Sequence, residues 1–252
     1  MWGRVVDGLK LTFHLAGINN QNFLMRDEET GTYWQQISGL AVAGPLKGRQ
    51  LPFVASEELT FGLWRAEHAR GTIFKDSDKY KSEYSAMDWD VKMKKARTVL
   101  SYREAGLKPR DLMLGIHAFG ASRAFPFERV IQEKLVQDHV GTVPVLLVVG
   151  PDAQSVRGFR QHIPGIEGVP EFYRAVEEKP PAKLDAVAAS APLLMDNATG
   201  SRWNFQGCAV EGKAKGTCLE PVEVIKDYWF DWRHYNLKTS VYGKSLRGAQ
   251  SE

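Results

Sequence analysis

The chain has 252 residues, enough for one large or two modest domains, and its 43% hydrophobic and 25% charged content is ordinary for a folded protein. Its 33 basic and 30 acidic side chains leave a formal net charge of only +3, which argues against a nucleic-acid partner. The longest apolar run, residues 143–149, is far shorter than the roughly 20 residues of a membrane-spanning helix. We therefore expect no transmembrane segment, while peripheral association with a membrane stays open. No signal peptide is visible at the start of the chain.

The first part of the chain reads as short strands separated by turns. Lys10 to Leu15 alternates between apolar and polar residues, as a half-buried strand does. A turn at residues 27–31 and a link at residues 44–48 contain glycines, which supply the positive φ that such turns need. Residues 59–65 form an aromatic block with helical spacing. The strands expected here are residues 10–15, 23–25, 32–36 and 72–74.

A single long helix is predicted next. Ser85 can cap it, with Asp88 three positions further on, and Gly106 and Pro109 end it. A basic helix of this kind is typical of a solvated surface, although it can also dock on an acidic partner or a lipid surface. Its apolar face is formed by Trp89, Met93, Ala96 and Leu100, and its basic residues are Lys92, Lys94, Lys95, Arg97 and Arg103.

The remainder again reads mainly as β structure. Residues 112–116 and 143–149 are apolar throughout, as buried strands are, and a short helix beginning at Pro126 lies between them. Residues 164–190 are rich in Pro, Gly, Glu and Lys and are expected to form an exposed excursion. The polar tail from Gly243 is expected to be loose.

Two stretches of the chain nearly repeat each other. Residues 30–51 read TGTYWQQISGLAVAGPLKGRQL and residues 199–219 read TGSRWNFQGCAVEGKAKGTCL, with one residue of slippage after the Trp. The register continues to a Trp-Arg pair in each copy, at Trp64 and Trp232. We therefore predict an α+β protein, mainly β, built from two related β-rich modules that a helical connector joins. The predicted boundaries are residues 1–80 for the first module, 81–108 for the connector and 109–252 for the second module.

Several strings occur in a characteristic order along the chain. They are FLMRDEETGTYWQQISGLAVAGPLKGRQL, TFGLWRAEHARGT, DLMLGIHAFGASRAFPF, QDHVGTVPVLLVVG and DYWFDWRHYNLKTSVYG. In these strings the chain resembles bacterial proteins catalogued as domain-of-unknown-function family 3179, over most of its length apart from residues 80–105 and 164–190. The resemblance implies a β-rich, typically exported protein of unknown biochemical activity, with a periplasmic or extracellular location.

The chain departs from that family in one respect. Members usually carry a Cys-Pro-Leu-Cys-like motif just before the segment where this chain starts, so the motif would lie before Met1. The equivalent place in the second copy is residues 150–155, which contain no cysteine. Any thiol chemistry of relatives is therefore not carried over to this chain.

The two cysteines, Cys208 and Cys218, lie on either side of a turn centred near Ala214. If the flanking residues pair as a hairpin, the two cysteines face each other at about 4.5–5.5 Å between Cβ atoms, near what a disulfide needs. A cross-strand disulfide and two half-buried free thiols both remain open. A metal pair is less favoured, because no further Cys or His has the usual ligand spacing.

The second aromatic block contains three potential metal ligands, Asp227, Asp231 and His234. On a helix these residues share a face and could hold a metal ion. The alternative interpretation is that the acids cap and solvate a short helix while neighbouring tryptophans pack into the core. The first copy favours this alternative, because its corresponding residues are Leu59, Leu63 and Ala66.

The recurring tryptophans are interpreted as architecture. Trp34 and Trp203 lie in strands beside glycine-rich hairpins, where a core position is more typical than a ligand-stacking one. Trp64 and Trp232 occur in both copies and are assigned to packing as well. The two turn motifs, Asp27 with Thr30 and Asp196 with Thr199, are expected to stabilise their turns by side-chain-to-backbone hydrogen bonds.

The sequence carries no phosphate loop, nucleophile elbow or paired-cysteine zinc pattern, so we predict no catalytic residue and no cofactor. The first functional hypothesis is a non-catalytic exported binding protein or accessory subunit that acts through protein contacts. The first module lacks the strand block that residues 109–163 give the second, so we expect either that residues are missing before Met1 or that a partner subunit covers the gap. The second hypothesis is a redox or metal-dependent enzyme whose thiol motif lies upstream of Met1.

Overall fold

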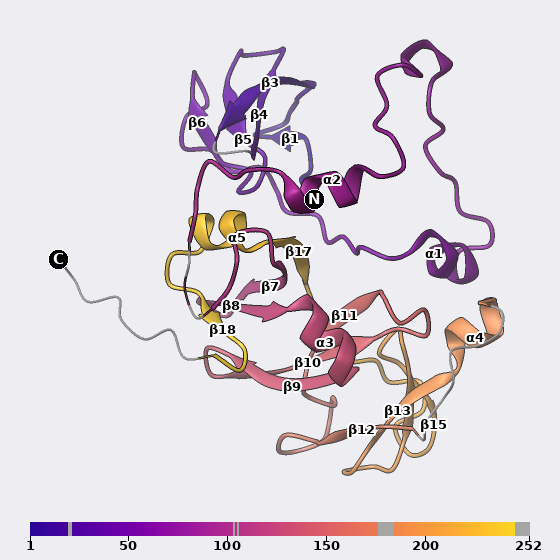
Figure 1. Cartoon of the computed structure of the whole chain (residues 1–252). Helices are drawn as coiled ribbons and strands as arrows, with labels where there is room; N and C mark the ends of the chain where they lie inside the picture. Colours follow the sequence, from indigo (N-terminus) through magenta and orange to yellow (C-terminus); the bar gives the residue numbers. More distant parts are fainter. Residues whose placement is uncertain (20–21, 103, 105, 176–183, 245–252) are drawn as a thin grey trace. The chain divides into compact units, whose positions relative to one another are not determined.

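The computed structural model describes residues 1–19, 22–102, 104, 106–175 and 184–244. The protein is β-rich, as predicted, and its strands form several sheets (Figure 1). The chain divides into two compact units, each assembled from separated segments. Unit 1 comprises Met1–Ser56, Arg97–Asp111 and Tyr228–Leu237, and unit 2 comprises Glu57–Ala96, Leu112–Asp227 and Lys238–Glu252.

Unit 1 contains a four-stranded antiparallel meander with the strand order β3-β4-β5-β6. Its strands are β3 (Phe13–Asn19), β4 (Asn22–Asp27), β5 (Tyr33–Gln35) and β6 (Ala41–Ala43), preceded by the hairpin of β1 (Val5–Val6) and β2 (Leu9–Lys10). The buried core of the meander consists of Val6, Leu11, Trp34, Ala41 and Leu51. Helix α5 (Trp229–Tyr235) also belongs to this unit, although it follows the second meander in the chain.

Unit 2 contains three four-stranded sheets, with strand orders β17-β7-β8-β18, β16-β11-β10-β9 and β12-β13-β14-β15. The strands are β7 (Leu112–Ala118), β8 (Ala121–Pro126), β9 (Leu135–Val140), β10 (Val143–Val149), β11 (Val156–Arg160), β12 (Phe172–Arg174), β13 (Pro192–Asp196), β14 (Arg202–Asn204), β15 (Ala209–Glu211), β16 (Pro221–Val222), β17 (Ile225–Tyr228) and β18 (Ser240–Val241). The helices are α1 (Phe61–Glu67), α2 (Trp89–Lys95), α3 (Phe127–Glu133), α4 (Ala186–Ser190) and a 3₁₀ turn, η1 (Asp78–Tyr80).

Strand β10 separates the two cores of unit 2. Leu146 and Val148 point into the core that lies against the β12–β15 sheet. Val145, Leu147 and Val149 point into the core that lies against β7, β8 and α3. Burial on both faces explains why the predicted strand at 143–149 is apolar throughout instead of alternating.

The two meanders are held by the same set of contacts. Phe13 of β3 meets the ring of Trp34 edge-on with 6.0 Å between centroids, and Phe172 of β12 meets Trp203 in the same way at 5.8 Å. Both tryptophans are fully buried, which confirms their predicted core position. In both meanders the register opposes the phenylalanine to an aspartate that ends the next strand, Asp27 in one and Asp196 in the other.

Each of these aspartates organises a buried turn. Trp34 Nε1 donates to Asp27 at 2.7 Å, and Trp203 Nε1 donates to Asp196 at 2.9 Å. Thr30 and Thr199 donate to the same carboxylates through both hydroxyl and backbone N–H, which confirms the predicted turn motifs. Burial alone would raise the pKa of each carboxyl, but these hydrogen bonds outweigh it and lower the pKa.

Glycine is required where each meander folds over its buried turn. Gly44 has φ +106°, and a Cβ there would lie 2.7 Å from Cα of Thr32. Gly212 has φ +91°, and a Cβ there would lie 2.6 Å from Cα of Ser201. Both positive φ and backbone contact therefore exclude a larger residue.

The cysteines form a disulfide across an antiparallel bridge, with 4.0 Å between their Cα atoms, so the cross-strand alternative is confirmed. The first meander contains the same bridge between Leu40 and Gln50. The flanking backbone bonds match as well: Leu51 N–H donates to Gly39 and Leu219 N–H donates to Gly207, each at 2.9 Å. The disulfide therefore fastens one of two hairpins that share this bridge and this backbone bond.

Three expectations from the sequence are wrong in part. Among the described residues, which leave out Arg103 and residue 105, the long helix is only Trp89–Lys95, because none of its side chains is buried and a short helix without tertiary packing is marginal. No strand forms at residues 72–74. The expected excursion at 164–190 contributes β12 and α4 to unit 2, because Phe172 and Ala189 fill the core; residues 176–183 lie outside the described part.

Within the ranges that the structure describes, no helix is both long enough and apolar enough to cross a bilayer. The short helix α2 presents Lys92, Lys94 and Lys95 in its last turn. Its docking on an acidic or lipid surface stays a prediction. Of the tail that was expected to be loose, residues 245–252 lie outside the described part.

The matching bridges predict that a second disulfide can be installed. We expect the double variant Leu40→Cys/Gln50→Cys to form a disulfide on oxidation, because the backbone already brings these positions together as it does the native pair. Closing a loop of this length should raise the free energy of unfolding by about 2–3 kcal/mol. Thiol titration and denaturant unfolding check this, with Leu40→Ser/Gln50→Ser as control. Two reactive thiols after oxidation would contradict the equivalence of the hairpins.

Candidate functional site

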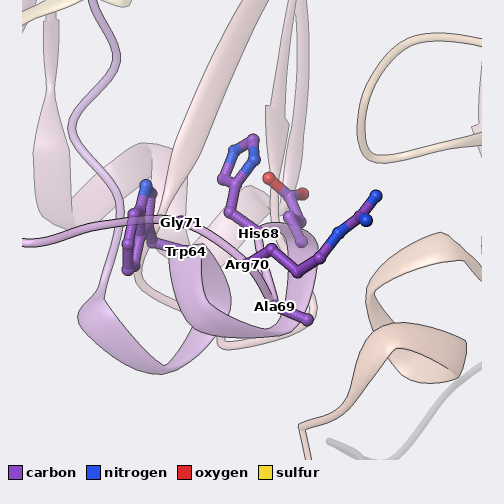
Figure 2. A pocket seen from close by; sticks show the side chains of 6 residues that line it. Trp64, His68, Ala69, Arg70 and Gly71 are labelled. Carbon is purple, nitrogen blue, oxygen red and sulfur yellow. The ribbon is translucent and has the colours of Figure 1, made fainter.

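An open pocket of about 530 Å³ lies at the C-terminal end of α1 in unit 2. It is lined by Trp64, Glu67, His68, Ala69, Arg70 and Gly71. Figure 2 shows the rings of Trp64 and His68 projecting from the helix end, while the side chain of Arg70 extends away from them. The two rings lie 5.8 Å apart. A Cβ at Gly71 would lie 2.6 Å from the Trp64 ring, so glycine is needed for the chain to pass this indole.

The loop at residues 150–155 fixes the start of α1. Thr60 caps the helix at the N–H of Leu63 and donates its hydroxyl to Asp152 at 2.6 Å. Ser155 donates to the same carboxylate and accepts from Thr60 N–H at 3.0 Å. Burial would raise the pKa of Asp152, but the bonds from Ser155 and Thr60 outweigh it and lower the pKa. The loop therefore anchors the start of the helix.

A buried ion-pair network fixes the end of α1. Arg157, only 7% exposed, donates to both carboxylate oxygens of Glu67 at 2.8 Å and to both of Glu57 at 2.7 Å. Gln206 adds a bond to Glu67 at 2.6 Å. Burial would lower the pKa of the Arg157 guanidinium, but the two carboxylates outweigh it and raise the pKa. The acidic side chain of the pocket is thus fully engaged, and Trp64, His68 and Arg70 remain for contact with a ligand.

A second candidate surface lies in unit 1, on one face of β3 and β4. The register places Leu15 opposite Met25 and Ile18 opposite Phe23, with a bulge at Ala16 between the two pairs. Leu15, Ile18 and Phe23 are 60%, 67% and 49% exposed, and together we call them the β3–β4 face. Met25 also opposes the buried Trp34, so the face continues the core surface of the meander. Adjacent exposed apolar side chains of this kind mark interaction sites.

The predicted metal ligands do not share a helix. Asp227 lies in β17, so the expected helical spacing is wrong for this residue, because the helix begins only at Trp229. Asp231 and His234 lie in α5. Among the described residues no group of three Asp, Glu, His or Cys side chains is placed to hold a metal ion.

Asp231 is instead a buried carboxyl of unit 1. It is 8% exposed and accepts a hydrogen bond from Asn22 Nδ2 at 3.3 Å. Its Oδ1 atom has no hydrogen-bond partner among the described residues. Burial raises the pKa of Asp231 against the opposing effects of Asn22, His234 and Arg110. The predicted role of a solvated cap is therefore wrong, because the helix turns this side chain inward.

The second pair of recurring tryptophans is not equivalent in burial. Trp232 is 2% exposed, as expected for a packing residue, whereas Trp64 is half-buried and lines the pocket. Sequence reasoning also missed Arg157, Glu67 and Gln206, since a network spread over such distances along the chain has no local pattern. A usable signal was Arg157 itself: a charged residue that lies between Val156 and Phe159 in a short strand suggests a buried partner.

The raised pKa of Asp231 predicts a particular pH dependence. A carboxyl whose folded-state pKa exceeds its model value of 3.8 favours folding when protonated, and this advantage is lost as pH rises through the folded-state pKa. Asp231→Asn should match the parent near pH 3 and be more stable by about 1 kcal/mol near pH 7. Denaturant unfolding at the two pH values checks this, with the exposed Asp7→Asn as control. An equal effect of Asp231→Asn at both values would contradict it.

Comparisons with known proteins bear on the family alone. No curated protein and no solved structure matched the chain in similarity searches. One family model, described as Protein of unknown function (DUF3179), matches residues 1–239 of the 252-residue chain, including the two regions that the sequence strings left out. The chain therefore belongs to this family of proteins of unknown function.

Proposed function

We propose that the protein is a non-catalytic exported binding protein, or an accessory subunit of a larger assembly, that acts through protein contacts. The observation that carries the proposal is the exposed β3–β4 face of unit 1. Exposure of three large apolar side chains to water is unfavourable, at about 25 cal/mol for each Å² left uncovered. A partner that covers them recovers this energy.

Unit 2 supports the proposal, because its corresponding face is covered. Leu194 takes the place of Met25 and is 1% exposed, in one core with Leu146 and Val148 of the neighbouring sheet. Arg174 takes the place of Leu15 and donates to the carbonyl of Val149 at 2.8 Å. By analogy with β10, we expect the partner of the β3–β4 face to contribute a strand or sheet with an aliphatic face.

We infer that the two meanders are copies of one module. Both meanders contain the Asp–Trp hydrogen bond, and both are followed by a Trp-Arg pair. Both also contain an antiparallel bridge at the same place, between the cysteines in one and between Leu40 and Gln50 in the other. The domain boundaries at 1–80, 81–108 and 109–252 are retained as part of this proposal. The exposed β3–β4 face then lies in the copy whose described residues form one four-stranded sheet and the small β1-β2 hairpin.

Export is supported by the disulfide, since disulfides persist in oxidising compartments such as the periplasm and the extracellular space. The same disulfide does not favour a redox enzyme over a binding protein. Its counterpart in the first meander is the Leu40–Gln50 bridge, which holds the hairpin without sulfur. A fastening role accounts for both hairpins.

Site-specific photo-crosslinking in the producing cell tests the proposal. We expect a photoreactive benzoyl-phenylalanine at Ile18 to form an adduct with one defined protein, because this side chain lies in the β3–β4 face. The same residue at His14, exposed on the opposite side of the same strand, is the matched control. Equal adducts at both positions, or adducts with lipid alone, would overturn the proposal. An adduct of twice the chain's own mass would identify the partner as a second copy.

A further inference from the structure

We propose that the exposed side of α1 binds a peptide segment in which a tyrosine lies two positions before a glutamate. The inference is independent of the β3–β4 face and comes from comparing α1 with α5. Each helix carries a Trp-Arg pair, Trp64 with Arg65 in α1 and Trp232 with Arg233 in α5. The two arginines occupy equivalent positions but differ in what contacts them.

In unit 1 a segment of this kind already lies against α5. Arg233 donates from Nε and Nη2 to the two carboxylate oxygens of Glu104, at 2.9 and 3.0 Å. Its guanidinium carbon lies 5.5 Å from the ring centre of Tyr102. The Tyr102 hydroxyl is 3.1 Å from Nδ1 of His234, the residue that follows Arg233 in α5. The planar guanidinium of Arg233 thus makes a bidentate ion pair with the carboxylate and lies over the face of the aromatic ring. These contacts leave the Arg233 side chain 13% exposed.

In the described part of unit 2, no such segment contacts the equivalent arginine, Arg65. Arg65 is exposed, and its guanidinium lies over the ring of Phe61 on its own helix, 5.9 Å from the ring centre. Within the described ranges no carboxylate pairs with Arg65 or with Arg70. Arg65 on α1 and Arg70 in the turn after it therefore present two guanidinium groups whose charge a carboxylate can neutralise.

The pocket beside Arg65 fits the aromatic part of the segment. Trp64 stacks on Phe61 at 5.9 Å and faces His68 at 5.8 Å, so the rim is aromatic. Arg157 is shared between Glu67 and Glu57, so these three side chains keep one net negative charge, which the cations Arg65 and Arg70 outnumber. The oxygens of Glu67 are also occupied by Arg157 and Gln206, which disfavours a saccharide whose hydroxyls need such acceptors. Charge and ring contacts together favour an acidic, tyrosine-containing peptide.

The test is a nuclear magnetic resonance titration of the full chain with the blocked peptide Gly-Ser-Tyr-Ala-Glu-Ala-Gly. We expect the indole N–H of Trp64 and the amides of α1 to shift, and added salt to weaken binding. Arg65→Gln should weaken binding about fivefold, and replacing the peptide's Glu by Gln should do the same. Arg4→Gln removes an exposed arginine elsewhere and should change nothing.

A charge exchange guards against a misfolded variant. Arg65→Glu should lose the original peptide and bind the peptide in which Lys replaces Glu, which a merely damaged helix would not do. Binding that is unchanged in Arg65→Gln would overturn the inference. The inference would also be overturned if a chitin trisaccharide shifted the Trp64 indole signal and the peptide did not.

Discussion

A buried aspartate that accepts a hydrogen bond from a buried tryptophan is the interaction on which both meanders depend. Asp27 and Asp196 are each 1% exposed, and a buried carboxylate is tolerable only when its oxygens are satisfied. The tryptophan indole, the threonine hydroxyl and the backbone N–H groups of the turn supply those bonds. One constraint therefore fixes the end of one strand, the turn and the start of the next.

The helices that follow the meanders are distributed crosswise between the units. Helix α1 follows the first meander but belongs to unit 2, where Leu63 enters the core and Glu67 is held by Arg157. Helix α5 follows the second meander but belongs to unit 1, where Asp231 is held by Asn22. Each unit is thus completed by a helix from the other half of the sequence. Neither half of the chain contains all the segments of one unit.

Local patterns in the sequence were sufficient for the elements that local physics decides. The Asp-x-x-Thr turns, the facing cysteines and the double-sided strand at 143–149 each leave a short, readable pattern. The failures arise where tertiary contacts decide. The pattern at 85–106 has helical periodicity, yet most of it finds no core to pack on, and β12 lies in a segment whose composition suggested a loop.

The candidate sites were the least predictable features. The pocket depends on a network that joins Glu57, Arg157 and Gln206, which are far apart in the chain. The near-repeat was nevertheless an indirect guide to the candidate sites. Residues that recur in both stretches are assigned to the architecture, and residues that differ between them are candidates for function. In unit 2 the face of the meander is covered and Arg65 is exposed. In unit 1 the β3–β4 face is exposed and Arg233 is covered. These differences carry both functional proposals.

The most direct measurement of the central claim is the free energy of unfolding of Asp27→Asn, Asp196→Asn and the double variant. An asparagine keeps the shape but turns an N–H group toward a donor, so each substitution should cost roughly 2–3 kcal/mol. The two losses should add within about 0.5 kcal/mol, because the sites belong to separate units. A large loss for Asp196→Asn together with an unchanged stability for Asp27→Asn would contradict the account, since the first meander would then not depend on the bond that it shares with the second.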